Sequence, residues 1–223
     1  MKPQTPARPS RRREKSGGGA DSDQTRSTVL SVAIQEFASK GLAGARVDEI
    51  ARAAQVNQQA LYYYFGSKDG LFAAALEQGY RRILESNIQL ANAIAELPPK
   101  EAIEFLVGKF FDRLVERREM VALIQDENRY GGIHLKNREL VRSSTVPLVQ
   151  ALDRILDEGA KTGAFSSRYT AEELYVNILS LCMFYFTDAH TLSVLLGKAL
   201  LDPQEIQSRR EQVIVFVLRA LGA

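Results

Sequence analysis

The chain has 223 residues, of which 45% are hydrophobic and 25% charged, the usual balance of a soluble globular protein. This length suffices for one compact body or for two small domains. No apolar run reaches the roughly 20 residues that a membrane-spanning helix needs, and no apolar stretch follows the N-terminal charges as in a secretory signal. We therefore expect a cytoplasmic protein that does not associate with a membrane.

The net charge of +2 is distributed unevenly along the chain. Residues 1–20 contain six Lys or Arg and one Glu, a net charge of +5, so the remaining residues sum to −3. Over residues 21–80, five Lys or Arg stand against seven Asp or Glu, a net charge of −2. Nucleic-acid binding cannot be inferred from a basic domain here, so it must rest on a motif.

Residues 1–22 are expected to form a disordered basic arm, because they are rich in Pro, Arg, Ser and Gly and have almost no apolar side chain to bury. Two roles remain open for this arm. It is either a solubilising leader or an extension that binds phosphates and adds salt-dependent affinity without sequence preference.

Helical periodicity begins at about Thr25 and continues over nearly the whole chain. Gly41 stands where a helix C-terminus favours a left-handed residue. Asn57 and Ser67 are typical N-caps, because their side-chain oxygens can accept from a backbone N–H one turn later. After the first helix we predict helices at 47–54, 58–65, 68–95, 100–118, 119–130, 134–142, 146–160, 171–189 and 203–221. No strand alternation or repeat is present, so the predicted fold class is all-α.

Residues 47–65 match the pattern of a short helix, a tight connection and a second short helix. The small Ala51 allows the two helices to pack closely at a steep angle, as a helix-turn-helix requires. Gln55 occupies the turn position where glycine is common, and Val56 is the apolar residue expected to hold the connection against the core.

A helical wheel divides the second of these helices into two faces. At about 100° per residue, Leu61 and Phe65 lie about 40° apart and mark the inward face. Tyr63 falls nearly opposite, with Gln59 close to it. Three consecutive tyrosines sweep about 200°, so they cannot all be buried. The tyrosines either belong to a binding surface or are ordinary core and rim aromatics. The second interpretation is disfavoured, because the outward face lacks the charge that would keep an ordinary surface hydrated.

The residue types on this outward face match the chemistry of the DNA major groove. Glutamine pairs with N6 and N7 of adenine, and apolar groups contact the thymine methyl. Phenolic hydroxyls donate to phosphate oxygens. Gln58–Tyr64 is therefore predicted to read the groove, with double-stranded DNA as the partner.

Residues 25–76 resemble the DNA-binding domain of the TetR/AcrR family of transcriptional regulators. The resemblance runs in order through Phe37-Ala-Ser-Lys-Gly41, Val47-Asp-Glu-Ile-Ala51, Leu61-Tyr-Tyr-Tyr-Phe65 and Ser67-Lys-Asp-Gly-Leu71. It implies base contacts from the start of the third helix and phosphate contacts from Tyr63, Tyr64 and Lys68. The candidate DNA-binding residues are Arg46, Asn57, Gln58, Gln59, Ala60, Tyr62, Tyr63, Tyr64 and Lys68.

Two of these residues depart from the family pattern. Arg46 stands where many members have Ser or Thr at the start of the second helix. An arginine there can still reach a phosphate, but it gives the helix no short polar cap. Gln58 replaces the Lys or Ser that is often found, which affects the operator sequence rather than the activity.

Residues 23–80 would then form the DNA-binding domain and residues 81–223 a larger helical domain that binds a small-molecule effector and dimerises. The segment Gln125–His134 resembles a Glu-Asn-x-x-Gly-Gly segment in a subgroup of the family that includes a pyrimidine-responsive regulator. We carry over no ligand from that subgroup. Asp126, Glu127 and Asn128 are interpreted as a capped, solvated helix end rather than a ligand site.

A homodimer is expected because a two-fold protein matches a palindromic operator. Two apolar helices, 146–160 and 171–189, would form a four-helix interface with their symmetry mates. An apolar stripe on either helix alone is more often part of the domain's own core. The family resemblance nevertheless favours an interface, through Leu148, Leu152, Ile155, Leu156, Leu174, Ile178, Leu181 and Tyr185.

A mixture of aromatic and polar side chains suits a concave site for the effector. The candidate residues are Phe110, Arg113, Tyr130, Asn177, Phe184 and Tyr185.

The sequence contains no motif that indicates catalysis or metal binding. His134 and His190 have no metal-ligand spacing, and no Gly-x-Ser-x-Gly or Gly-rich phosphate loop occurs. We expect no enzyme, no cofactor and no metal; His134 is interpreted as a surface or structural residue. Cys182 lies in an apolar run and is interpreted as a buried structural thiol rather than a redox sensor.

The predicted function is a ligand-responsive, DNA-binding transcriptional regulator. Repression is the usual outcome in the family that the chain resembles, so we expect a repressor that binds a palindromic operator as a dimer and is released by a small molecule. The alternatives are an architectural DNA-binding protein without an effector and an enzyme.

Overall fold

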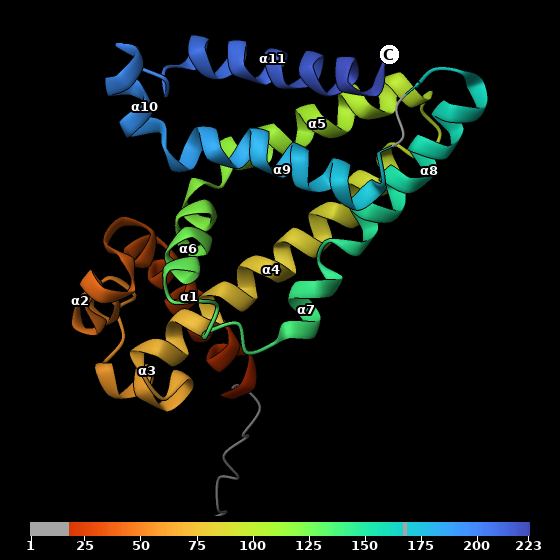
Figure 1. The fold of residues 1–223 in the computed structure, drawn as a ribbon. Helices are drawn as coiled ribbons and strands as arrows, with labels where there is room; N and C mark the ends of the chain where they lie inside the picture. Colours follow the sequence, from red (N-terminus) through yellow and green to blue (C-terminus); the bar gives the residue numbers. More distant parts are fainter. Residues whose placement is uncertain (1–17, 167–168) are drawn as a thin grey trace, which may run out of the picture.

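The computed structural model describes residues 18–166 and 169–223, which form eleven helices (Figure 1). No strand occurs in these two ranges, so the predicted all-α class is confirmed. Residues 1–17 of the predicted basic arm lie outside the described part.

The first hydrophobic core is formed by α1 (Gly18–Gly44), α2 (Val47–Ala53), α3 (Gln58–Phe65) and the first half of α4 (Lys68–Ala93). Gly41 has a φ of 66°, as predicted, and breaks α1 close to its end. Ser67 caps α4, because its Oγ accepts from the N–H of Gly70 at 2.9 Å. These two local signals mark the end of α1 and the start of α4.

α1 begins at Gly18, so residues 18–22 of the predicted arm are helical instead. Contacts with α3 account for this difference. The Oγ of Ser22 lies 3.1 Å from the hydroxyl of Tyr64, and the guanidinium of Arg26 lies 5.4 Å from the centre of the Phe65 ring. Periodicity could not indicate these contacts, because they join residues about forty positions apart.

The second core holds α5 packed against α8, α9 and α11, and the second half of α4 joins this core against α8. In Figure 1, α11 and α5 lie side by side at the top, and α6 leads from α5 towards α1. Cys182 is fully buried here, as predicted. The helices of this half are α5 (Pro99–Glu116), α6 (Arg118–Arg129), α7 (Arg138–Ser143), α8 (Val146–Thr162), α9 (Ala171–Thr187), α10 (Ala189–Leu196) and α11 (Pro203–Leu221).

Two of these elements differ from the prediction. The helix predicted at 134–142 begins only at Arg138, because the backbone N–H of His134 donates to the carboxylate of Glu127 at 2.7 Å. α10 was not predicted; it follows α9 after a bend of 74°. Among the described residues no single helix is long and apolar enough to cross a membrane, and α9 and α10 meet that test only as this bent pair.

α4 belongs to both cores. Its first half contributes Leu71 and Leu76 to the first core, and its second half contributes Leu90 to the second. α6 also reaches into the first core, through Met120 and Leu123. The boundary that we expect between residues 80 and 81 therefore falls inside a continuous helix, with α6 packed across it.

Candidate nucleic-acid interface

A tight turn connects α2 to α3 and sets the angle of the predicted reading helix. Gln55 has a φ of 57°, in the left-handed region that favours glycine. The N–H of Val56 donates to the carbonyl of Ala51 at 3.0 Å, and its side chain packs against the first core, as predicted. The Oδ1 of Asn57 accepts from the N–H of Ala60 at 2.7 Å, so this side chain starts α3.

α3 turns the predicted reading face away from the core. Leu61 is buried, whereas Tyr63 is 85% exposed and Tyr62 is 51% exposed. Gln58 and Gln59 are exposed on the first turn of the helix. The outer side of α3 therefore presents amide and phenol groups, which can hydrogen-bond to bases and phosphates without carrying charge.

Two further candidates are held by contacts within the chain. Tyr64 is partly buried beside Ser22, so its hydroxyl is shared with α1. The ammonium of Lys68 donates to the carbonyls of Ala43 and Ala45, both at 3.2 Å. Since an ammonium has three donors, Lys68 has one left for a phosphate while it fixes the segment between α1 and α2.

Arg46 stands at the N-cap of α2 and its side chain makes no capping hydrogen bond, as its departure from the family pattern implies. Its exposed guanidinium donates to the carboxylate of Asp48 at 3.1 and 3.3 Å. These bonds raise the pKa of Arg46 and lower that of Asp48. Because exposed ion pairs contribute little, the guanidinium can exchange this carboxylate for a DNA phosphate at small cost.

Asp126 and Glu127 of α6 are buried, which corrects their interpretation as a solvated helix end; Asn128 is exposed. The Oδ2 of Asp126 accepts from the N–H of Leu42 at 2.6 Å. This bond joins α6 to the residue that follows the break in α1 at Gly41. The two acids were expected in solvent because consecutive carboxylates are rarely buried without partners, and here the partners come from distant segments.

Glu127 connects α6 to the start of α4. One of its carboxylate oxygens lies 2.6 Å from Nδ1 of His134, and the other accepts from the backbone N–H of the same residue. His134 packs edge-on against Phe72, with the ring centres 5.2 Å apart, and its Nε2 lies 3.9 Å from Asp69. His134 is thus structural, and α6 is fixed to both helices that flank the α2–α3 pair.

Sequence comparisons agree with this architecture over both halves of the chain. Residues 29–75 match the family model for bacterial regulatory proteins of the tetR family. Residues 99–217, more than half of the chain, match the model for the tetracyclin repressor-like C-terminal domain. The chain belongs to the TetR family. Membership places the two cores described above in a known arrangement of a helix-turn-helix domain followed by a helical domain.

Several relatives of this TetR-family protein are regulators of transcription. The repressor NicS of Pseudomonas putida is 33% identical over 182 residues, which cover 82% of this chain and 85% of NicS. A transcriptional regulator of Streptomyces coelicolor, SCO4942, superposes with a TM-score of 0.62 at 24% identity, covering 87% of this chain and 97% of that chain. FadR of Bacillus subtilis, solved with stearoyl-CoA, gives 0.60 at 16% identity, covering 87% and 98%. These two structures show the shared fold.

The six predicted effector residues of this TetR-family protein do not line one cavity. Phe110 and Arg113 lie together on α5, where the guanidinium is 5.7 Å from the ring centre. Tyr130 packs against the first core, and Asn177 is exposed on α9. The sequence placed all six in one half of the chain, but it could not show which helix faces meet.

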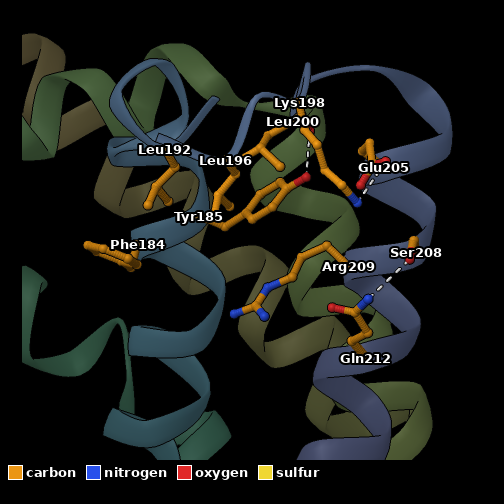
Figure 2. Close-up of a pocket in the computed structure, with 10 residues that line it drawn as sticks. All are labelled: Phe184, Tyr185, Leu192, Leu196, Lys198, Leu200, Glu205, Ser208, Arg209 and Gln212. Atoms are coloured by element: carbon orange, nitrogen blue, oxygen red, sulfur yellow. Dashed lines mark hydrogen bonds and ion pairs between the residues drawn. The ribbon is translucent and has the colours of Figure 1, made fainter. Parts of the chain in front are cut away.

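Phe184 and Tyr185 line a cavity of about 450 Å³ between α9, α10 and α11 (Figure 2). The hydroxyl of Tyr185 donates to the carbonyl of Leu200, and the guanidinium of Arg209 lies 5.6 Å from its ring centre. Figure 2 shows both side chains in the same opening. Sequence reasoning missed Arg209, because its contacts are with α9: its Nη2 donates to the carbonyl of Leu181, 28 positions away, and it lies over the ring of Tyr185.

Most of the predicted dimer stripe is interior. Leu148, Leu152, Ile155, Leu174, Ile178 and Tyr185 are buried in the chain's own second core, and Leu156 and Leu181 are partly buried against it. The six buried residues have no free surface for a partner, which corrects their assignment to an interface. Exposed apolar side chains occur instead elsewhere on α9, α10 and α11, at Val176, Phe184, Val194, Leu195, Leu196, Val215 and Phe216.

Proposed function

We propose that this protein is a transcriptional repressor that binds a palindromic operator as a homodimer and releases it when a small molecule binds to residues 81–223. The observation that carries the proposal is the uncharged, exposed face of α3, where Tyr63 and Gln59 point away from the buried Leu61. The similarity of this chain to NicS, a repressor, supports repression rather than activation. The role is regulatory rather than catalytic, and it is exercised in the cytoplasm, where the operator lies.

Specificity and general affinity come from different parts of the chain in this proposal. Gln58, Gln59 and Ala60 contact bases with help from Tyr62, whereas Tyr63, Tyr64, Arg46 and the remaining donor of Lys68 contact phosphates. Asn57 contributes by holding the first turn of α3. Because residues 21–80 carry a net charge of −2, the +5 of residues 1–20 supplies the sequence-independent attraction to DNA.

The homodimer forms through the exposed apolar faces of α9, α10 and α11. Two copies of α9 and α11 would make a four-helix interface and set the two α3 helices about 34–36 Å apart, one turn of DNA. Replacing both Phe184 and Phe216 by Glu should give a monomer in sedimentation. Val146, which is 41% exposed on α8, is the control, because V146E should leave the dimer intact. A double variant that stays dimeric overturns this surface.

The dimer has two conformations that differ in the spacing of the two α3 helices, and the effector acts by binding one of them more tightly than the other. α6 is suited to transmit this difference, because Asp126 and Glu127 connect it to α1 and, through His134, to α4. The same contacts argue against a purely architectural DNA binder, which would need no second domain coupled to the reading helix.

The operator is found by sequencing the genomic fragments that the purified protein selects. On that operator, changing both Gln59 and Tyr63 to Ala should weaken binding by at least about 2–6 kcal/mol, since the dimer loses two Gln59 base contacts at about 1–3 kcal/mol each and also the phosphate contacts of Tyr63. Gln212→Ala, on α11, is the control and should bind like the wild type. Unchanged affinity of the double variant would refute the reading face, and no release by any of a broad metabolite panel would favour the architectural alternative.

A further inference from the structure

Arg113, in the last turn of α5, is a partly buried cation without a carboxylate partner among the described residues. Its Nη1 donates to the Oδ1 of Asn87 at 2.9 Å, and its Nε donates to the carbonyl of Lys109 at 3.4 Å. Its Nη2 is buried and has no hydrogen-bond partner within the described part of the chain. A desolvated guanidinium donor left unpaired is costly, so natural proteins keep one where something else pairs with it.

The neighbouring arginine shows how this protein pairs a guanidinium when the role is structural. Arg210 of α11 donates through Nε and Nη2 to both carboxylate oxygens of Asp112, at 2.7 and 3.1 Å. Asp112 directly precedes Arg113. The carboxylate that pairs with Arg210 and the guanidinium that has no carboxylate partner are therefore adjacent on α5. The guanidinium of Arg210 is paired with a carboxylate of the chain, whereas that of Arg113 keeps one unpaired donor among the described residues.

Arg113 is also held in place rather than free to seek a partner. The amide of Asn87 is buried and donates to the carbonyl of Ser144 at 2.7 Å, which fixes the amide oxygen that the guanidinium contacts. Burial, together with a smaller contribution from the charge of Arg117, lowers the pKa of Arg113 to about 10, so both act against the charged form. A bound anion would relieve this unfavourable charge without moving the side chain.

The surroundings of Arg113 are aromatic. Its guanidinium lies 5.7 Å from the ring centre of Phe110, which packs edge-on with Tyr175 at 6.4 Å. Burial raises the pKa of Tyr175, so its hydroxyl stays neutral and available as a donor. The site therefore combines one free cationic donor with two aromatic rings contributed by α5 and α9.

We infer that Arg113 binds the carboxylate of the effector, a compact organic acid whose aromatic or aliphatic body packs against Phe110 and Tyr175. This inference rests on the proposed function and names the chemistry of its ligand. A singly charged carboxylate suits the site better than a phosphate dianion, because the aromatic surroundings would leave a second negative charge desolvated.

The first test compares the ligand-free dimers of the wild type, Arg113→Met and Arg210→Met. R113M removes an unpaired charge while keeping the length of the side chain, but it also leaves the Oδ1 of the buried Asn87 without its donor. Its Tm should therefore fall clearly less than that of R210M. R210M leaves Asp112 without its partner, so its Tm should fall. A Tm of R113M that falls as far as that of R210M would show that Arg113 is structural, and would overturn the inference.

The second test measures calorimetric binding of benzoate and octanoate, each beside its neutral amide, to the full-length dimer. The carboxylates should bind about 10- to 100-fold more weakly to R113M than to the wild type, as loss of a charged hydrogen bond predicts. The two amides should not distinguish the variants. The inference is overturned if neither acid binds, or if both bind R113M as tightly as the wild type.

Operator binding is measured separately, by gel shift without any acid, so that the two proposals can fail independently. If the wild type and R113M both bind the operator but no acid binds the protein, the carboxylate site is wrong and the regulator stands. If acids bind through Arg113 but no operator is ever selected, the proposed function fails and the site stands.

Discussion

Asp126→Ala should destabilise the protein by about 2–3 kcal/mol. Asp126 is 9% exposed, and its carboxylate accepts from the N–H of Leu42 at 2.6 Å. A charge-assisted bond contributes about 1.5–3 kcal/mol, and its removal also leaves a buried N–H unpaired. For a chain of this length the change corresponds to a fall in Tm of about 4–12 °C. Asp126→Asn keeps an acceptor oxygen but loses the charge, so about half of this loss is expected.

The assay is urea unfolding of the dimer at one fixed protein concentration, because dimerisation contributes to apparent stability. Asn128→Ala is the control, since that side chain is exposed and bonds only within α6, to the carbonyl of Ile124. The operator affinity of D126A should also respond less to effector, because α6 is no longer joined to the end of α1. Unfolding of D126A within 0.5 kcal/mol (roughly the spread of neutral surface variants) of the wild type would refute the reasoning.

Three further predictions concern single residues. Gln55→Gly should raise the free energy of unfolding by about 1 kcal/mol, because Gln55 has a φ of 57°; urea unfolding measures it, and no gain would show that the turn is unstrained. Cys182 should not react with a thiol reagent at pH 8 in the native dimer, because burial raises its pKa to about 12; reaction without unfolding contradicts this. Lys68→Met should lower stability by about 1 kcal/mol through the two lost carbonyl bonds, and an effect on operator affinity alone would assign Lys68 to phosphate.

The reading unit could be predicted from the sequence because its signals are local. Asn57 and Ser67 cap the helices that they precede, within one turn of the N–H groups that they accept from. Gln55 and Gly41 mark left-handed positions that the backbone itself requires. Once Leu61 is taken as the inward residue of α3, the helical wheel places Gln59 and Tyr63 on the opposite, exposed face. This prediction needs no knowledge of tertiary contacts.

The regulatory half was harder to predict because its chemistry depends on which helix faces meet. An apolar stripe looks the same whether it covers a core or a partner, and Leu148 and Leu174 turned out to be core. Asp126 looked solvated because its partner, Leu42, lies 84 positions away. Arg113 was singled out for its residue type alone, whereas the absence of a carboxylate beside it in the described residues is visible only in three dimensions.

Because α4 crosses both cores and α6 completes the first, the two halves are not interchangeable modules. A hybrid regulator that joins residues 1–80 of this chain to the helical half of another family member would lose Met120, Leu123 and the carboxylate of Asp126 from beneath the reading helices. Such a hybrid would need its new α6 redesigned to fit the end of α1. Effector specificity can therefore be exchanged between relatives only together with the surface of the first core against which α6 packs. Substitutions in one half of the chain thus restrict which substitutions the other half can accept during evolution.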